Sequence, residues 1–236
     1  LPAVWYEAVM HTADDYRIGA TMPGVPGLIM GRTRDLSFGF TYGFMDQIDF
    51  FIEDCRGGAC RRGDGYRPLE VRDELVLRKG AAPLHVTVRE SDLGVLECDS
   101  LEPELADGLY LCRAWSGHRH GAAASLDALA RLGTARTVAA AQRMVREVAI
   151  SCNWVLADRA GHIGYQQSGL LPDRRHSGLH PVPAWEERWH WRGFVPAERL
   201  HSILDPVEGF LATANQDLNP PGGPLVINLP MGSYRA

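Results

Sequence analysis

Histidines are the residues in this sequence that first suggest metal chemistry. His118 and His120 lie two residues apart, and His176, His180 and His190 fall within a segment rich in proline and tryptophan. Imidazole is a common metal ligand, so two or three of these side chains could hold a catalytic ion. No His-Glu-x-x-His arrangement accompanies them, and such loop histidines are more often solvated. The histidines therefore favour a metal hydrolase only weakly.

Two other reaction classes lack the residues that they need. Glu186 and Glu187 are adjacent, and adjacent side chains usually point apart, whereas a glycosidase needs two carboxyl groups at a set separation. No glycine-rich phosphate loop opens a helix, which disfavours a nucleotide-dependent enzyme.

The five cysteines leave the redox state open. Cys55 and Cys60 flank Arg-Gly-Gly-Ala, a flexible segment that could close as a small disulfide loop in an oxidising compartment. Reduced, unpaired thiols are the alternative. No Cys-x-x-Cys pair exists, which disfavours a structural zinc site.

Composition excludes several classes of protein. The chain has 236 residues, with 45% apolar and 22% charged residues and a net charge of −5, which is typical of a folded globular protein. Acidic and basic residues are mixed, so we expect no nucleic-acid partner. No apolar run approaches the roughly 20 residues of a membrane span, so we expect no membrane partner. The segment from Leu1 to Tyr6 lacks the basic start and long apolar stretch of a signal peptide, so we expect any export signal to have been removed already or to lie upstream.

The elements that position these residues are mostly strands in the first half of the chain. Alternation over 4–10 predicts a strand buried on both faces. Short strands are expected at 28–30 and 36–41, after a turn at 23–27. The sequence then predicts a surface loop at 55–66. A hairpin is expected within 69–98, with its turn at 79–83.

Helices are expected only in the middle of the chain. A helical region over 125–150 is broken near Gly133, and Ser125 and Thr134 are the expected N-caps. A hairpin at 153–165 follows. The sequence then predicts mostly irregular structure to 206 and a strand over 209–214 that runs into Asn215. Together these elements predict an α+β fold of layers with helices outside, in a single domain spanning 1–236.

Seven separated segments resemble one family in the same order. They match the β-chain of the penicillin acylase (penicillin amidase) family and together span essentially the whole chain. Each motif alone is weak, but their order is specific. The segments are 23–31, 37–41, 46–49, 153–165, 169–174, 181–183 and 209–215.

The resemblance implies an N-terminal-nucleophile hydrolase with an αββα sandwich, incomplete in this chain. Members of that family are precursors that cleave themselves, and the nucleophile is a serine at the start of the β-chain, which we expect upstream of Leu1. Ser151-Cys152-Asn153-Trp154 is similar to such a start but is internal, so we do not interpret it as the nucleophile. The implied partners are the α-chain and further β-chain segments, and the implied location is the periplasm or outside the cell.

The same resemblance implies roles for individual residues. Asn215 corresponds to the side-chain donor for the oxyanion, and the main-chain N–H of Tyr42 to the second donor. Arg235 corresponds to the arginine that organises the surroundings of the nucleophile. Without the family, Asn215 would be interpreted as a residue closing a turn. Phe40, Phe44 and Trp154 are possible walls of the acyl pocket, with core packing as the alternative.

Asp46, Ile48 and Asp49 correspond to the family's calcium loop, through two carboxylates and the carbonyl of Ile48. Calcium takes six to eight oxygens at about 2.3–2.6 Å. Where the family has a further aspartate, this sequence has apolar residues at 225–227. The resemblance therefore implies a structural Ca²⁺, with a solvated acidic loop as the alternative, and no organic cofactor.

The resulting prediction is an amidohydrolase that cleaves a small-molecule linear carboxamide, either a β-lactam side chain or an acyl-homoserine lactone. Because the serine is expected outside the chain, we expect the isolated chain to be inactive. The alternative is a non-catalytic binding or assembly module, or an inactive fragment of the same family.

Overall fold

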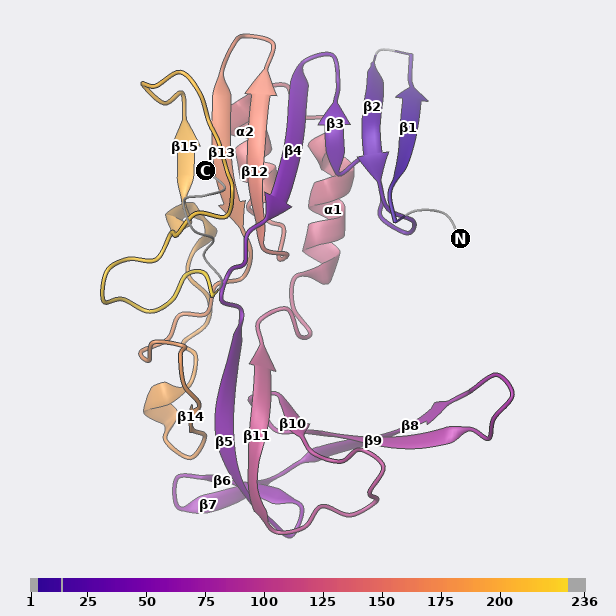
Figure 1. Cartoon of the computed structure of the whole chain (residues 1–236), viewed down its shortest axis with the longest axis vertical. Helices are drawn as coiled ribbons and strands as arrows, with labels where there is room; N and C mark the ends of the chain where they lie inside the picture. The colour runs from indigo at the N-terminus through magenta and orange to yellow at the C-terminus, as the bar shows by residue number, and fades with distance from the viewer. Residues whose placement is uncertain (1–3, 14, 229–236) are drawn as a thin grey trace.

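Backbone pairing organises the chain into two sheets that lie end to end along the long axis of the molecule (Figure 1). The structure, a computed structural model, describes residues 4–13 and 15–228. Residues 43–47 lead directly from a strand of one sheet into a strand of the other. The junction between the sheets is therefore crossed by the main chain itself.

The upper sheet has seven strands in the order β1-β2-β3-β4-β12-β13-β15, and each neighbouring pair is antiparallel. Its strands are β1 (Tyr6–His11), β2 (Tyr16–Thr21), β3 (Met30–Arg32), β4 (Leu36–Tyr42), β12 (Cys152–Asp158), β13 (Ile163–Ser168) and β15 (Ser202–Leu204). The hairpin expected at 153–165 is confirmed as β12 and β13. The strand expected at 4–10 forms, but β1 is an exposed edge strand, so its predicted burial on both faces is wrong.

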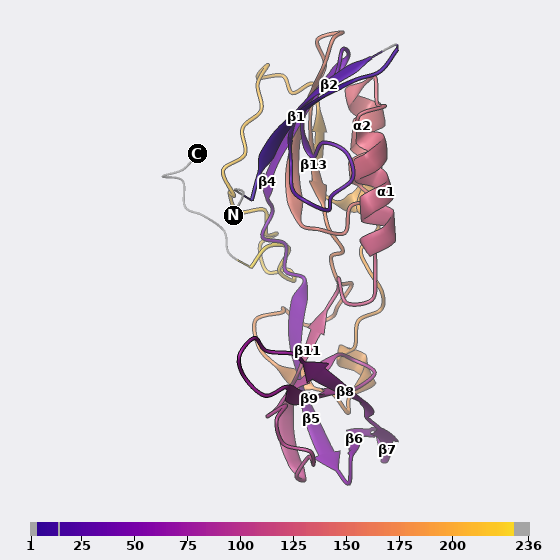
Figure 2. The same cartoon turned by 90° about the vertical axis from the view of Figure 1, so that its right-hand side faces the viewer.

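Two helices cover one face of this sheet, and residues 205–228 cross the opposite face (Figure 2). They are α1 (Ala122–Leu132) and α2 (Val138–Val145). Apolar side chains from both helices and from β4 and β12 form the buried core between the layers, including Leu36, Phe38, Leu132, Val138 and Trp154. No helix in residues 4–13 and 15–228 is long and apolar enough to cross a membrane.

The helix break is as predicted, but the caps are different. Thr137 caps α2, and its hydroxyl accepts a hydrogen bond from the Ala140 amide at 3.2 Å. Gly121, with a φ of 75°, is the N-cap of α1 and provides no side-chain hydrogen bond. Ser125 instead lies one turn inside α1, where its Oγ accepts from the Ala149 amide at 2.8 Å. Thr134 follows α1 and donates back to the Arg131 carbonyl.

The lower sheet has eight strands in the order β7-β6-β5-β11-β10-β9-β8, with β14 parallel to β5. Two 3₁₀ turns, Glu187–Trp189 and Ala197–Arg199, lie in the later connections. The hairpin predicted within 69–98 is confirmed as β8 and β9. The strands are β5 (Ile48–Arg56), β6 (Ala59–Arg62), β7 (Gly65–Pro68), β8 (Glu70–Val76), β9 (Leu84–Glu90), β10 (Val95–Glu97), β11 (Gly108–Trp115) and β14 (Val182–Pro183).

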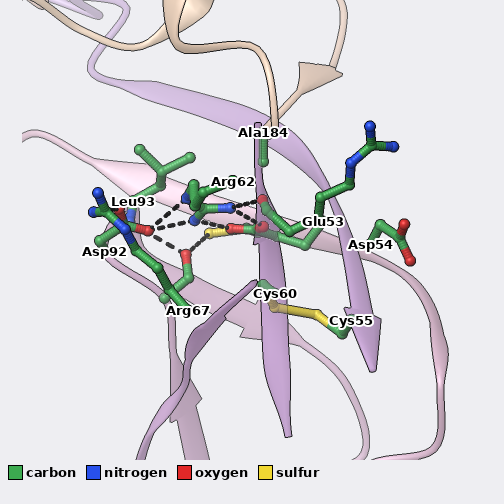
Figure 3. A network of polar contacts seen from close by, with 12 residues as sticks. Glu53, Asp54, Cys55, Cys60, Arg62, Arg67, Asp92, Leu93 and Ala184 are labelled. Atoms are coloured by element: carbon green, nitrogen blue, oxygen red, sulfur yellow. Dashed lines mark hydrogen bonds and ion pairs between the residues drawn. A yellow bond between two sulfur atoms is a disulfide. The ribbon is translucent and has the colours of Figure 1, made fainter. Parts of the chain in front are cut away.

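A disulfide and a buried ion network hold the β5–β6 hairpin (Figure 3). Cys55 and Cys60 are bonded to each other, which settles the alternative between a disulfide and free thiols. Arg62 donates from its two terminal nitrogens to both oxygens of Glu53, at 2.6 and 2.8 Å, and also contacts Asp92. The prediction of a surface loop at 55–66 is therefore wrong, because these residues belong to paired strands. The sequence pattern misses these strands because their inward residues are cysteine and arginine rather than alternating aliphatic residues.

One more predicted element is absent. Residues 209–214 have no strand pairing, although their apolar composition favours a strand. Gly209, with a φ of 75°, and Asn215, with a φ of 62°, bracket the segment in the left-handed region, which interrupts an extended ladder.

Candidate functional site

Asn215 lies against the main chain at the end of β4. Asn215 is only 4% exposed, and its side-chain Nδ2 donates a hydrogen bond to the carbonyl oxygen of Tyr42. The left-handed backbone at Asn215 is one that asparagine tolerates better than most residues. A bend, rather than the end of a strand, therefore aims this carboxamide at β4.

Tyr42 presents its main chain on the same edge as Asn215. The Gly43 amide donates to the Ser151 carbonyl at 3.0 Å. Because hydrogen-bonded pairs alternate along an antiparallel ladder, the N–H and C=O of Tyr42, opposite Cys152, point away from β12. On that side β3 pairs with β4 only at positions 37 and 38. The edge of β4 near Tyr42 therefore has no strand beside it among the described residues.

Ser151 and Gly43 hold the chain just after Tyr42. The Ser151 Oγ accepts a hydrogen bond from the Met45 amide at 2.8 Å. A side chain at Gly43 would bring its Cβ within 2.6 Å of that Oγ, so glycine is required for this close approach. Cys152 is buried, and burial raises the pKa of its thiol to about 12. Neither Ser151 nor Cys152 is placed as a nucleophile, in agreement with the sequence interpretation.

Asn153 ties the bend that carries Asn215 to the sheet. Its Nδ2 donates to the Thr213 Oγ1 at 3.3 Å, and its Oδ1 accepts from the Tyr165 hydroxyl at 2.8 Å. The sequence places Asn153 in one of the family-like segments but predicts no role for it. Because Thr213 lies two residues before Asn215, the bond to Thr213 makes Asn153, on β12, a positioning residue for Asn215.

An apolar cavity of about 80 Å³ opens beside Tyr42 on the helix side of the sheet. The Phe40 ring lies 5.0 Å from the Trp154 ring and 6.1 Å from the Tyr42 ring, between centroids. Phe44 is not part of this wall. Trp154 is also a core residue, since its Nε1 donates to the Ser168 Oγ at 3.0 Å. The cavity is further lined by Met22, Val25, Ile29, Leu129, Val148, Ile150 and Cys152.

A buried arginine lies between the two carboxylates expected to bind calcium. Arg174 donates to the Oδ2 atoms of Asp46 and of Asp49, the latter at 2.7 Å, and to the carbonyl of Leu225 at 2.9 Å. The Trp191 Nε1 also donates to Asp49, at 2.7 Å. Burial raises the pKa of the Asp46 carboxyl, although Arg174 acts in the opposite direction. The cluster joins the β4–β5 connection to the segment after β13.

These residues do not fit a calcium ion. The Arg174 guanidinium supplies the positive charge at Asp46 and Asp49, and the described residues include no group of three acidic, histidine or cysteine side chains that could hold a metal. The buried polar atoms of this cluster that lack a hydrogen-bond partner are nitrogens rather than oxygens: the Nε of Arg174, and the Nε2 of His176, which lies 3.7 Å from the Asp49 Oδ2. Ile48, the third expected ligand, begins β5 and is 39% exposed.

The remaining expected residues are dispersed. His118 bonds to Glu90 at 3.1 Å, and the His190 Nε2 contacts the Ala184 carbonyl at 2.7 Å. Burial lowers the pKa of His176. The histidines of the described segments thus form no shared metal site. Arg235 lies outside the described residues.

Comparison with known proteins identifies what this arrangement resembles. The sequence model of the penicillin amidase family matches residues 1–236. The acyl-homoserine lactone acylase QuiP of Pseudomonas aeruginosa is 30% identical over 94% of this chain and 28% of its own length. The penicillin G acylase of Escherichia coli is 29% identical over 91% of this chain and 25% of its own length. The chain thus spans about a quarter of the length of these relatives.

A solved structure gives the same fold. The thermostable penicillin G acylase from Alcaligenes faecalis superposes with a TM-score of 0.83 over 99% of this chain and 42% of its own, at 22% identity. This likeness confirms the predicted α+β fold of an N-terminal-nucleophile hydrolase. Within the described residues this fold consists of one helix layer on the upper sheet, and the lower sheet lies beyond the end of the upper one (Figure 1).

Proposed function

Because this chain belongs to the penicillin amidase family, we propose that the protein containing it hydrolyses a linear carboxamide and that this chain provides the donors for the oxyanion. The observation that carries the proposal is the contact between the Asn215 carboxamide and the main chain of Tyr42. A neutral amide held in a buried bend is a preorganised donor, which is the kind of group that stabilises charge developing on an acyl oxygen.

The proposed reaction uses a serine outside this chain as the nucleophile. Its hydroxyl attacks the carbonyl carbon of the substrate, and its own α-amine accepts the proton, since the pKa of such an amine is about 7.7–8.0. The carbonyl oxygen becomes an oxyanion, toward which Asn215 Nδ2 and the Tyr42 N–H donate. The amine then leaves with a proton, and water hydrolyses the acyl-serine to release the acid. We assign Arg235, by family resemblance, to organising the surroundings of the serine.

The apolar cavity beside Tyr42 is the proposed acyl pocket, with Phe40 and Trp154 as walls. Its volume of about 80 Å³ is far below the roughly 300–1,000 Å³ of a typical small-molecule pocket. The Tyr42 ring lies at one side of this space, packed edge-on against Phe40. We therefore propose that Tyr42 limits the acyl group to a short one. We retain Phe44 only as a residue near the site, since it does not line the cavity.

The names of the relatives suggest the substrates to test. One group of relatives is named for acyl-homoserine lactones and the other for penicillin. The substrate proposed here is an amide whose acyl side is apolar and whose amine is a homoserine lactone or a β-lactam nucleus. Acyl specificity will also depend on parts of the protein outside this chain, including the proposed α-chain.

An assay of amine release by the protein in its natural length tests this function. The substrates are N-acyl-homoserine lactones with acyl chains of increasing length, together with benzylpenicillin. We expect release of the amine, fastest for the shorter acyl chains, and a shift toward longer chains in Tyr42→Ala. No amine release from any substrate would contradict the hydrolase proposal and favour a binding or assembly module.

We also propose export to the periplasm or the exterior of the cell. The disulfide between Cys55 and Cys60 supports this location, because structural disulfides persist in oxidising compartments. Fractionation of the source cells tests it: the protein should be found in the periplasm or the medium, and its recovery only from the cytoplasm would contradict the proposal.

A further inference from the structure

A chain of hydrogen bonds runs from β13 to the bend that carries Asn215. Tyr165 of β13 is 2% exposed, and its hydroxyl donates to the Asn153 Oδ1 at 2.8 Å. Asn153 in turn donates from its Nδ2 to the Thr213 Oγ1 at 3.3 Å, two residues before Asn215. We call this chain of Tyr165, Asn153 and Thr213 the Tyr165 relay. It connects the interior of the upper sheet to the bend.

The middle of the relay lies between the segments that carry the two proposed oxyanion donors. Asn153 pairs on β12 with Thr41, the residue before Tyr42. A Cβ atom added at Gly43, the residue after Tyr42, would lie 3.2 Å from the Asn153 Oδ1. The other end of the same amide contacts Thr213. A displacement of Asn153 would therefore reach both donor segments.

The tyrosine end of the relay is anchored on the helix layer. The Tyr165 carbonyl accepts from the Gln142 Nε2 of α2 at 2.9 Å, and the Tyr165 ring packs edge-on against His201, with centroids 5.2 Å apart. Burial raises the pKa of the Tyr165 hydroxyl, so this group stays protonated and can donate to Asn153. The main chain and ring of Tyr165 thus give its hydroxyl a fixed position.

The hydroxyl matters because the amide that it contacts is buried. Asn153 is 2% exposed, and in the part of the chain that the structure describes its Oδ1 receives its hydrogen bond from Tyr165. Without that donor the buried oxygen is unsatisfied, which is unfavourable in free energy. Turning the amide toward another donor relieves this cost but breaks the contact with Thr213. The Tyr165 hydroxyl therefore keeps the amide aimed at the bend.

We propose that Tyr165 is a positioning residue for Asn215 and acts through Asn153. Tyr165 itself contacts no reacting atom. Its hydroxyl fixes the Asn153 amide, and that amide fixes the bend from which the Asn215 Nδ2 reaches the main chain of Tyr42. Donors stabilise an oxyanion best when they are held in place beforehand, so a looser bend lowers kcat. The inference rests on the proposed hydrolase function.

Amine release by Tyr165→Phe in the protein of natural length tests the inference, because phenylalanine keeps the ring and removes only the hydroxyl. With the substrate that the unaltered protein cleaves fastest, we expect kcat to fall roughly 2- to 12-fold, the fold-change of one lost hydrogen bond, with little change in KM. The matched control is Tyr110→Phe, which removes a hydroxyl bonded to the Ala106 carbonyl at 2.9 Å and should leave kcat unchanged. Equal kcat values for the two variants would overturn the proposal.

Combination with Asn215→Ala separates positioning from a general structural effect. If Tyr165 acts through the carboxamide at 215, Tyr165→Phe should cause no further loss of kcat once that carboxamide is gone. Tyr165→Phe should likewise cause no further loss in Asn153→Ala, since both substitutions break the same relay. Losses that multiply in either double variant would overturn the proposal, because the hydroxyl would then act by another route.

Hydrogen exchange gives a result that does not depend on activity. Peptides covering 210–217 should exchange faster in Tyr165→Phe than in the unaltered protein, because the bend opens more often, and Tyr110→Phe should leave that rate unchanged. Unchanged exchange at 210–217 in Tyr165→Phe would overturn the proposal even if kcat falls. Absence of amine release by the unaltered protein would instead contradict the hydrolase function, and faster exchange would then still show that Tyr165 holds the bend.

Discussion

Replacing Arg174 tests how the two sheets are joined. Its side chain has no exposure, and its two carboxylate partners, Asp46 and Asp49, are 3% and 2% exposed. Arg174→Ala leaves two buried carboxylates together without their cation. Removing one partner of a buried ion pair costs about 3–5 kcal/mol, much more than the pair contributes when both partners are present. We therefore expect the free energy of unfolding, measured by urea denaturation, to fall by about 3–5 kcal/mol.

Arg192 provides the matched control. It also pairs with an aspartate of the same region, Asp173, at 2.5 Å, but the two side chains are 52% and 41% exposed. An exposed pair contributes about 0–1 kcal/mol, so Arg192→Ala should cost no more than that. The loss in the free energy of unfolding for Arg174→Lys should lie between those of Arg174→Ala and Arg192→Ala, because one ammonium cannot bridge both carboxylates as a guanidinium does. A loss for Arg174→Ala within about 1 kcal/mol of the control would refute the role assigned to this buried cluster.

Three further predictions follow from the buried charges. EGTA should leave the urea midpoint unchanged, because Arg174 already supplies positive charge at Asp46 and Asp49; a calcium-dependent midpoint would contradict this. Because the folded pKa of Asp46 is raised above 3.8, its contribution to stability is present below pH 3.8 and is lost as the pH rises through the folded pKa. Stability relative to Asp46→Asn should therefore increase as the pH falls from neutral, and a flat difference would count against the burial. Glu53→Gln should cost about 3–5 kcal/mol in urea denaturation because Arg62 loses its buried partner, whereas the matched Asp54→Asn should cost about 1 kcal/mol or less; equal losses would show that burial of Glu53 is unimportant.

Local sequence patterns predict the elements whose side chains alternate in the ordinary way. The β8–β9 hairpin and the β12–β13 hairpin follow from period-two patterns and glycine-containing turns. The β5–β6 hairpin does not, because two of its inward residues are Cys60 and Arg62, whose burial depends on a disulfide and on Glu53. Such partners are visible only after the fold has brought them together.

The site residues illustrate the same limit. Family resemblance suggests Asn215 and Tyr42, but their contact joins positions 173 residues apart, and no local pattern encodes it. The same holds for Arg174, which lies within a recognised motif yet pairs with residues 128 and 125 positions earlier. The apolar residues before Asn215 predict the end of a strand, whereas the structure has a bend with a φ of 62° at Asn215. The left-handed backbone that aims the carboxamide leaves no clear signal in composition.

The most direct test of the central claim is the kcat for amine release by Asn215→Ala in the protein of natural length. Removing one oxyanion donor typically lowers kcat by about 10²–10³-fold, and the proposal predicts a loss of that size with little change in KM. Gln216→Ala, which alters the same bend but leaves the carboxamide at 215, should retain most of the activity. A kcat for Asn215→Ala equal to that of this control would contradict the assignment of Asn215 to the oxyanion.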